Sequence, residues 1–401
     1  MDIFGLHELV WKRYMRMPYC HLLDCADEQG NAVIPTAQEC RAGLPTVVGW
    51  TTPIADCAFF GGLYLYGLCE KYDNEPTDAV GDEIRKVADG LFLLCDIAKV
   101  DGFIARGVAD DGVSHYPVSS DDQFTPWVLG LWRLLHSRAC DQALGEQIRA
   151  RLIRTLRGAM KADWKVPAEW EGQTICNLQG KDWRSVAMLS FVTMVACEMG
   201  LMTKEQWQAL AQEKPEDSIY TRREIAARGF APDMIRHTNL IQFWITVSGS
   251  IGLTHVMDFD AEHAADYRQA LHLNAMVAVE FADQYKFYMK QRTDFEHDWR
   301  KILPEVKPWS NLDEAMEEGR RLNTLWATTY NKGRNPERGP LAQCIFGMWL
   351  GILDPEERTA DYAYESLLRA IDAIDWNGVQ HSYAFAAEAA IYCYKTRRKK
   401  Q

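Results

Sequence analysis

The sequence lacks the cysteine patterns of metal-binding and disulfide-rich domains. Its eleven cysteines are scattered, without a CxxC pair and without the spacing of metal ligands. Several lie inside apolar stretches, including Cys57, Cys95 and Cys344, where a reduced cysteine behaves as a small hydrophobic residue. We therefore predict reduced thiols, no bound metal or other cofactor, and a cytoplasmic location, or a periplasmic one if a leader has been removed.

Long apolar runs and flexible linkers are also missing. No uninterrupted apolar segment approaches the roughly 20 residues that span a bilayer, and the N-terminus lacks the basic-then-apolar pattern of a secretion signal. No stretch rich in Pro, Gly or Ser divides the chain, and 47% of its 401 residues are hydrophobic, enough for a large core. The sequence thus predicts one domain over residues 1–401.

Basic residues are too few to balance the acidic ones. Lys and Arg number 44 against 56 Asp and Glu, which gives a formal net charge of −12. Such a surface repels phosphate backbones and anionic lipids, so we expect neither a nucleic-acid nor a membrane partner. The sequence also lacks GxxxxGK[ST], HExxH and GxSxG, and no GxGxxG opens a helix; the enzyme classes that use these motifs have no support.

Two kinds of helical pattern alternate along the chain. Amphipathic, charge-rich segments cover residues 2–17, 78–99, 140–161, 203–212, 261–290 and 355–374. Nearly uncharged segments begin near residues 55, 123, 184, 238, 341 and 382. Apolar residues at i, i+3, i+4 and i+7 indicate helices with one buried and one solvent-exposed face. A helix that is apolar on all sides is expected to be buried.

A regular alternation of this kind indicates a repeated helical unit. Six buried helices surrounded by six amphipathic ones predict an all-α fold, an (α/α)6 toroid. A short β-hairpin within residues 166–183 and an extra helix near 312–327 would lie in its loops. An irregular bundle and a helical solenoid are the competing folds.

In a toroid the loops that enter the inner helices gather at one end, and long structured loops are often functional. Four aspartates there are candidate catalytic residues: Asp56, Asp121, Asp122 and Asp182. Asp56 and Asp121, like Ser120, also fit ordinary helix N-caps. A cap explains one of the adjacent Asp121 and Asp122 more easily than both. Their repulsion and partial burial would raise one pKa, as a general acid requires.

Aromatic and polar side chains in the same loops are candidate substrate contacts. Aromatic faces stack on sugar rings, and an arginine can bind a carboxylate with two hydrogen bonds. The candidates are Trp50, Arg106, Tyr116, Gln123, Trp183, His237, Asn239, Trp376 and His381. The alternatives are core filling for the tryptophans, a loop salt bridge for Arg106, and structural hydrogen bonds or capping for the histidines.

Two segments resemble the six-hairpin glycosidase superfamily: PIADCAFFGGLYLYGLCEKYD at 53–73 and GFIARGVADDGVSHYPVSSDDQFTPWVLGLWRLL at 102–135. The alternating helix pattern extends this resemblance over nearly the whole chain. Related unsaturated uronyl hydrolases place an aspartate near the start of each of two inner helices. The resemblance implies that Asp56 and Asp121 or Asp122 are the counterparts here.

These observations predict a glycoside hydrolase for an oligosaccharide that contains an acidic sugar. Asp121 or Asp122 is expected to be the general acid, and Asp56 or Asp182 the base. A polysaccharide lyase is the second hypothesis, with Tyr116 or His237 as base and Arg106 or Asn239 to neutralise a uronate. An epimerase using His237 and His381, and a carbohydrate-binding protein without turnover, complete the alternatives.

Overall fold

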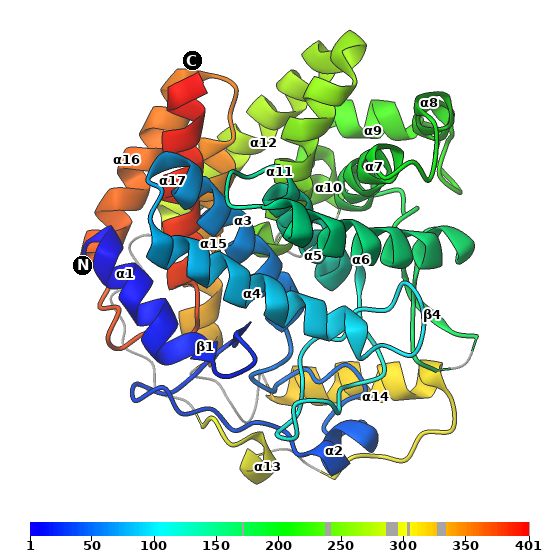
Figure 1. The fold of residues 1–401 in the computed structure, drawn as a ribbon, viewed down its shortest axis with the longest axis vertical. Helices are drawn as coiled ribbons and strands as arrows, with labels where there is room; N and C mark the ends of the chain where they lie inside the picture. The colour runs from blue at the N-terminus through cyan, green and yellow to red at the C-terminus, as the bar shows by residue number, and fades with distance from the viewer. Residues whose placement is uncertain (171, 237–241, 286–295, 303–304, 327–333, 401) are drawn as a thin grey trace.

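The computed structural model describes the chain except for residues 171, 237–241, 286–295, 303–304, 327–333 and 401. The fold is all-α, as the sequence predicts: helices dominate the described residues, and the strands there are short (Figure 1).

The six nearly uncharged segments form helices close to the predicted starts. They are α3 (Cys57–Asn74), α5 (Asp121–Leu135), α7 (Trp183–Glu198), α11 (Phe243–Phe259), α15 (Arg334–Ile352) and α17 (Ala384–Lys400). In α3 every residue from Cys57 to Glu70 is buried, and in α5 every residue from Gln123 to Leu134. This all-round burial matches the lack of a polar stripe in their sequences.

The amphipathic segments form helices with one buried side. They are α1 (Ile3–Leu9), α4 (Asp78–Asp96), α6 (Gln142–Lys161), α8 (Lys204–Gln212), α12 (Ala264–Tyr285) and α16 (Glu357–Ala373). A further short helix, α9 (Arg222–Arg228), corresponds to none of the predicted segments. In α4 the buried positions include Val80, Ile84, Val87, Leu91 and Leu94, a spacing of three or four residues. Such a helix covers the core with one face and leaves the other to solvent.

The buried helices contact one another in chain order. Helix α3 contacts α5, α5 contacts α7, α7 contacts α11, α11 contacts α15, α15 contacts α17, and α17 contacts α3. Each also contacts an amphipathic neighbour, for example α4 on α3, α6 on α5, α12 on α11, α16 on α15 and α1 on α17. One large apolar core contains residues from α1 to α17.

Helices α3 and α5 cross at two glycines. A Cβ on Gly62 would overlap the carbonyl oxygen of Pro126, and a Cβ on Gly130 would overlap the carbonyl oxygen of Gly62. The absence of side chains lets the two backbones touch. This contact fixes the position of one helix start relative to the other, and both starts carry candidate aspartates.

The connecting segments add small elements. They include the strands β1 (Met15–Arg16) and β2 (His21–Leu22), α2 (Ala37–Arg41), the β3–β4 hairpin (Lys165–Pro167 and Thr174–Asn177), α10 (Ala231–Arg236), α13 (Trp299–Ile302) and α14 (Leu312–Leu325). The hairpin and α14 confirm two sequence predictions. In Figure 1, α2, α13 and α14 lie together at the lower end, far from the end of α17.

One predicted helix is much shorter than expected. The pattern at 2–17 predicts a continuous helix, but α1 ends at Leu9 and is followed by a π-helical turn (Val10–Tyr14) and β1. Pro18 disfavours helical backbone in the residue before it. The side chains of Arg13 and Tyr14 also bind carbonyl oxygens of Trp376, Asn377 and Val379.

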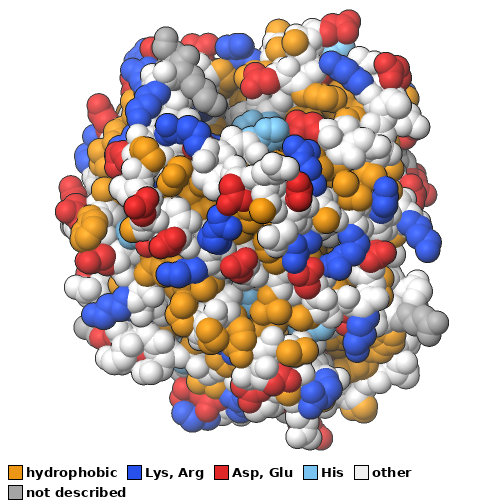
Figure 2. Space-filling view, viewed as in Figure 1, with side chains coloured by type: hydrophobic (Ala, Val, Ile, Leu, Met, Phe, Trp, Pro, Cys, Tyr) orange, Lys and Arg blue, Asp and Glu red, His pale blue; other side chains and the backbone are white. Residues whose placement is uncertain are grey.

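The outer surface of the face drawn in Figure 2 carries basic and acidic side chains intermixed with apolar ones. Among the described helices, none combines the length and the apolar character needed to cross a membrane.

Candidate active site

A cavity of about 440 Å³ lies where the first turns of several buried helices meet. Its walls come from the starts of α3, α5 and α11, the first half of α15, the end of α14 and two loops. The lining residues are Asp24, Trp50, Thr51, Ala55, Asp56, Asp122, Gln242, Trp244, Ile245, Asn323, Arg338, Gly339, Ala342 and Gln343.

Asp56 is buried in this cavity and does not act as a helix cap. It precedes α3, but its side chain accepts no capping hydrogen bond from that helix. Instead it accepts a hydrogen bond of 2.8 Å from Nε2 of Gln123 and lies 3.3 Å from Nη1 of Arg106. Burial, with the nearby charges of Asp24 and Asp122, raises the pKa of Asp56 to about 6, although Arg106 and Arg338 act in the opposite direction.

Asp122 reaches the same cavity from the first turn of α5. It accepts a short hydrogen bond from the Ser120 hydroxyl and lies 3.8 Å from Nη2 of Arg106. Arg106 in turn binds the Ala55 carbonyl oxygen at 2.7 Å and the Ser120 hydroxyl at 2.6 Å. One guanidinium group therefore joins the start of α3 to the start of α5 and lies between the two carboxylates.

Asp121 and Asp182 are not among the residues that line the cavity. Asp121 is buried and pairs with Nη2 of Arg184 at 3.0 Å; burial raises its pKa, which the charge of Arg184 opposes. Asp182 is the N-cap of α7 and accepts hydrogen bonds from the Ser185 amide at 3.0 Å and hydroxyl at 2.6 Å. The capping alternative therefore describes Asp182 and not Asp56.

Two half-buried tryptophans contribute apolar surface to the cavity. Trp50 comes from the loop before α3, and Trp244 from the start of α11. The guanidinium of Arg338 lies 5.0 Å from the centre of the Trp244 ring, and its Nη2 lies 3.9 Å from Asp56. The wall thus combines aromatic faces, the carboxyl groups of Asp24, Asp56 and Asp122, and a cation.

Thr51, next to Trp50, has a strained backbone. Its φ of 77° lies in the left-handed region, which a β-branched residue rarely adopts. Its hydroxyl is buried without a hydrogen-bond partner in the described part of the chain. Such strain tends to accumulate at functional sites, where the surrounding structure enforces it.

Several predicted substrate contacts lie behind the cavity wall or elsewhere. Gln123 is buried and supports Asp56, while its Oε1 accepts the Phe59 amide. Tyr116 is buried and donates to the Leu44 carbonyl oxygen. Trp183 donates to the Ala226 carbonyl oxygen, and Trp376 to that of Ile371, both from within the core.

His381 is fully buried, and its Nδ1 lies 2.6 Å from Oε1 of Glu337. It is not among the cavity-lining residues. His237 and Asn239 lie outside the described residues. Within the described part of the chain, no group of three or more His, Cys, Asp or Glu side chains is arranged to bind a metal ion.

Sequence reasoning did not single out Asp24, Trp244 or Arg338 as site residues. Asp24 is in the first long loop, where the backbone amide of Ser382 binds its carbonyl oxygen. That contact joins positions far apart in the chain, and no local pattern signals it. Trp244 lies inside an apolar segment, where an aromatic residue is expected to belong to the hydrophobic core. Arg338 is one of several polar residues that the sequence places in the long segment near 291–340, and in the structure it lies in the first turns of α15.

Comparison of the chain with models of protein families, with curated proteins and with solved structures gives no match.

Proposed function

We propose that the chain is a glycoside hydrolase on an (α/α)6 toroid, of the kind found in the six-hairpin glycosidase superfamily, acting on an oligosaccharide with an acidic sugar. The six buried helices contact one another in chain order, and the last of them, α17, contacts the first, α3. This closed series of contacts supports the toroid. The cavity at the starts of α3, α5 and α11 supports the expectation that entry loops build one site.

The observation that carries this proposal is the pair Asp56 and Asp122. The two carboxylates come from different helices, line the same cavity and lie within 4 Å of one guanidinium. Glycoside hydrolysis needs two such groups, one to protonate the leaving oxygen and one to activate water or attack the sugar. Neither carboxylate occupies a helix-capping bond, which argues against a purely structural role.

The electrostatics favour Asp56 as the general acid. Its raised pKa of about 6 keeps a large fraction protonated in mildly acidic solution. Asp122 is more exposed and is held by Ser120 and Arg106, which suits a charged base. This assignment reverses the roles expected from the sequence.

The rest of the wall fits a sugar with a carboxylate group. Trp50 and Trp244 offer faces on which sugar rings stack. Arg338, above the Trp244 ring, is positioned to bind a carboxylate on a stacked sugar. The lyase and epimerase alternatives have less support at two of their residues, because Tyr116 and His381 are engaged behind the wall. Their other candidate, His237, lies outside the described residues.

The test compares Asp122→Asn with Asp182→Asn on uronate-containing and neutral oligosaccharides. Asp122→Asn is expected to lower kcat by at least about a hundredfold without unfolding the protein, because a positioned acid or base contributes that much. Asp182→Asn is the control, since it alters the α7 cap and leaves the cavity intact.

Released reducing ends measure hydrolysis, and ultraviolet absorbance of a conjugated double bond in the product measures elimination. Full activity in Asp122→Asn would refute the proposed chemistry. Ultraviolet-absorbing products from the unaltered chain would establish a lyase instead.

A further inference from the structure

A second and larger cavity, of about 680 Å³, lies at the opposite ends of the buried helices. Its walls include the last turns of α3, α5, α7, α11 and α17. The lining residues are Asp73, Asn74, Trp132, Arg133, His136, Met194, Glu198, His255, Asp258, Phe259, Thr396 and Lys399.

The carbonyl ends of these helices make this region attractive to cations. The last carbonyl groups of a helix lack helical partners and carry partial negative charge. The chain already places its own cations on them: Lys399 binds the Asn74 carbonyl oxygen at 3.0 Å, Lys204 binds that of Phe259 at 2.9 Å, and Arg138 binds that of Asp73.

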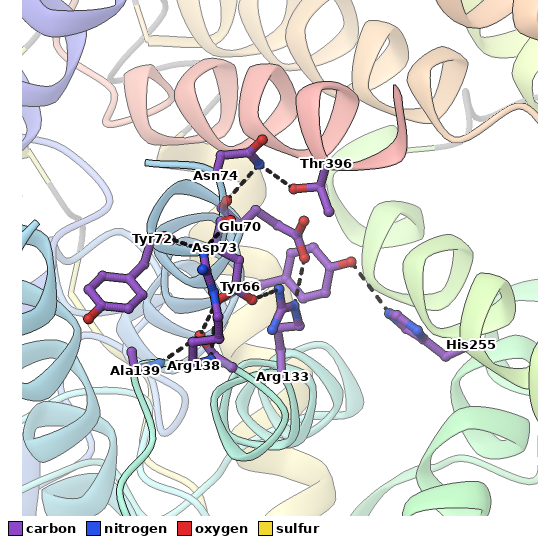
Figure 3. A network of polar contacts seen from close by, with 11 residues as sticks. Tyr66, Glu70, Tyr72, Asp73, Asn74, Arg133, Arg138, Ala139, His255 and Thr396 are labelled. Atoms are coloured by element: carbon purple, nitrogen blue, oxygen red, sulfur yellow. Dashed lines mark hydrogen bonds and ion pairs between the residues drawn. The ribbon is translucent and has the colours of Figure 1, made fainter. Parts of the chain in front are cut away.

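The positive charge of Arg133, which lines the cavity, is already paired with two carboxylates (Figure 3). Arg133 donates from Nε to Glu70 and from Nη2 to Asp73, both at 2.6 Å. Glu70 and Arg133 are buried, so this pair is a fixed part of the wall. Among the described residues that line the cavity, no unpaired buried cation therefore remains to attract an anion to this wall.

The cavity wall also carries hydrogen-bond acceptors that are not fully used by the chain. Oε2 of Glu198 accepts from the Trp132 indole at 2.6 Å and lies 3.1 Å from Nε2 of His136. Glu198 and the exposed Asp258 both line the cavity, and Oε1 of Glu198 takes part in neither of these two contacts. Within the described residues, Oδ1 of Asn74 is also buried and unpaired, although its Nδ2 donates to the backbone carbonyl oxygen of Glu70 and to the Thr396 hydroxyl (Figure 3).

The apolar part of the wall selects an organic cation over a metal ion. Trp132, Met194 and Phe259 line the cavity together with the acceptors, and aromatic rings attract organic ammonium groups. No cluster of metal-binding side chains exists among the described residues. We propose that this cavity binds an aliphatic amine, a primary amine or polyamine, whose ammonium group is held by Glu198 and Asp258 and whose carbon chain packs on Trp132.

The test is calorimetric titration of the full chain with spermidine at constant ionic strength. We expect saturable binding that Glu198→Gln and Asp258→Asn each weaken by about tenfold, because each removes a charge-assisted hydrogen bond. Asp82→Asn, which removes an exposed carboxylate of α4, serves as the matched control and is expected to bind as the unaltered chain does.

Glu198→Gln keeps an acceptor for the Trp132 indole, and Asp258 is exposed, so both variants are expected to fold; thermal melting verifies this. Absence of saturable spermidine binding, equal affinity in all three variants, or equally strong binding of Mg²⁺ would overturn the proposal. So would preferential binding of inorganic phosphate. The readout does not depend on the hydrolase activity proposed for the other cavity.

Discussion

Asp56 sits in surroundings that oppose its ionisation more than they favour it. Burial and the charges of Asp24 and Asp122 outweigh the attraction of Arg106 and Arg338 and raise its pKa from 3.8 to about 6. A raised carboxyl pKa means that the folded state binds the proton more tightly than the unfolded state does. The contribution of Asp56 to stability is therefore full below about pH 3.8 and is lost as the pH rises through 6.

Asp56→Asn is accordingly expected to stabilise the folded chain at neutral pH. The gain is on the order of 2 kcal/mol at pH 7 and shrinks as the pH falls toward 4, because the native carboxyl is then protonated. Urea denaturation at several pH values measures it. A variant whose advantage is constant across this range would contradict the pKa inferred for Asp56. The same variant is expected to lose hydrolase activity, since it cannot donate the proton.

At the level of single residues, sequence reasoning located some site residues and misread others. Asp56 and Asp122 stood out because loops that enter parallel helices meet at one end. Trp183 and Trp376 were chosen on residue type, but an indole N–H in the core finds a backbone carbonyl oxygen as readily as a ligand, and both do. Which of two adjacent aspartates faces a cavity depends on helix phase, and Asp121 points to Arg184 instead.

A half-buried charged contact joins α1 to α4 and α17. His7 lies between Glu83, at 3.0 Å from Nε2, and Glu388, at 3.0 Å from Nδ1. Burial alone would lower the pKa of His7, but hydrogen bonds to Glu388 and Glu83 outweigh it and raise the pKa to about 9. Its stabilising contribution is thus complete below about pH 6.5 and is lost as the pH rises through 9.

His7→Gln is expected to destabilise the chain by roughly 2 kcal/mol near neutral pH, the size of a lost charged hydrogen-bond pair, and to have little effect above pH 9. Chemical denaturation of both proteins across this pH range tests it. An equal loss at all pH values would show that packing, and not the charge of His7, attaches α1.

The crossing of α3 and α5 gives a second prediction for a whole element. Gly62→Ala is expected to destabilise the chain by about 3 kcal/mol, because the added methyl group meets the backbone of Pro126 and forces the helices apart. The control is Gly81→Ala in α4, whose new methyl group would lie 3.5 Å from the Tyr72 ring and is expected to stabilise by about 0.5–1 kcal/mol.

Thermal or urea unfolding measures both changes. If the two variants have the same stability, the backbone contact is not tight. Because the crossing also sets the spacing of the helix starts, Gly62→Ala is further expected to reduce activity more than its stability loss explains.

The helices themselves were largely readable from the sequence, since hydrophobic period and the lack of charge report burial directly. The ends of the helices were harder to predict from the sequence. The pattern at 2–17 does not reveal that Arg13 would leave the helix to bind carbonyl oxygens near residue 378. The short α9 has a capping box at Thr221 and Glu224, and this pattern in the sequence indicates the start of a helix.

The burial of the cysteine side chains gives a test of how the whole molecule is packed. Eight of the eleven cysteines are buried and the other three, Cys140, Cys176 and Cys197, are half-buried. Burial raises the pKa of Cys176 to about 12 and that of Cys197 to about 11, so few thiolates form near neutral pH.

A thiol reagent is therefore expected to label at most these three cysteines slowly in the native chain, and all eleven in urea. Mass spectrometry of labelled peptides identifies the sites. Rapid native labelling of Cys57 in α3 or Cys344 in α15 would contradict the burial of these two side chains.

The arrangement of the whole molecule was only partly predictable. An all-α fold follows from the two helix types, because a helix without a polar side requires other helices around it. Which loops meet could be inferred only by assuming a toroid. The second cavity escaped sequence reasoning altogether, since attention to entry loops says nothing about the opposite helix ends.

The N-terminal segment depends on the far end of the chain. Arg13 and Tyr14 bind carbonyl oxygens of residues 376–379, and the backbone of Asp24 is fastened by Ser382. During synthesis, the wall that carries Asp24 consequently stays unfinished until these late residues have left the ribosome. A chain interrupted before them would contain Asp24 without the contact from Ser382 that fastens it near Asp56 and Asp122. The catalytic activity proposed above is therefore expected to appear only after these late residues have folded, and not gradually.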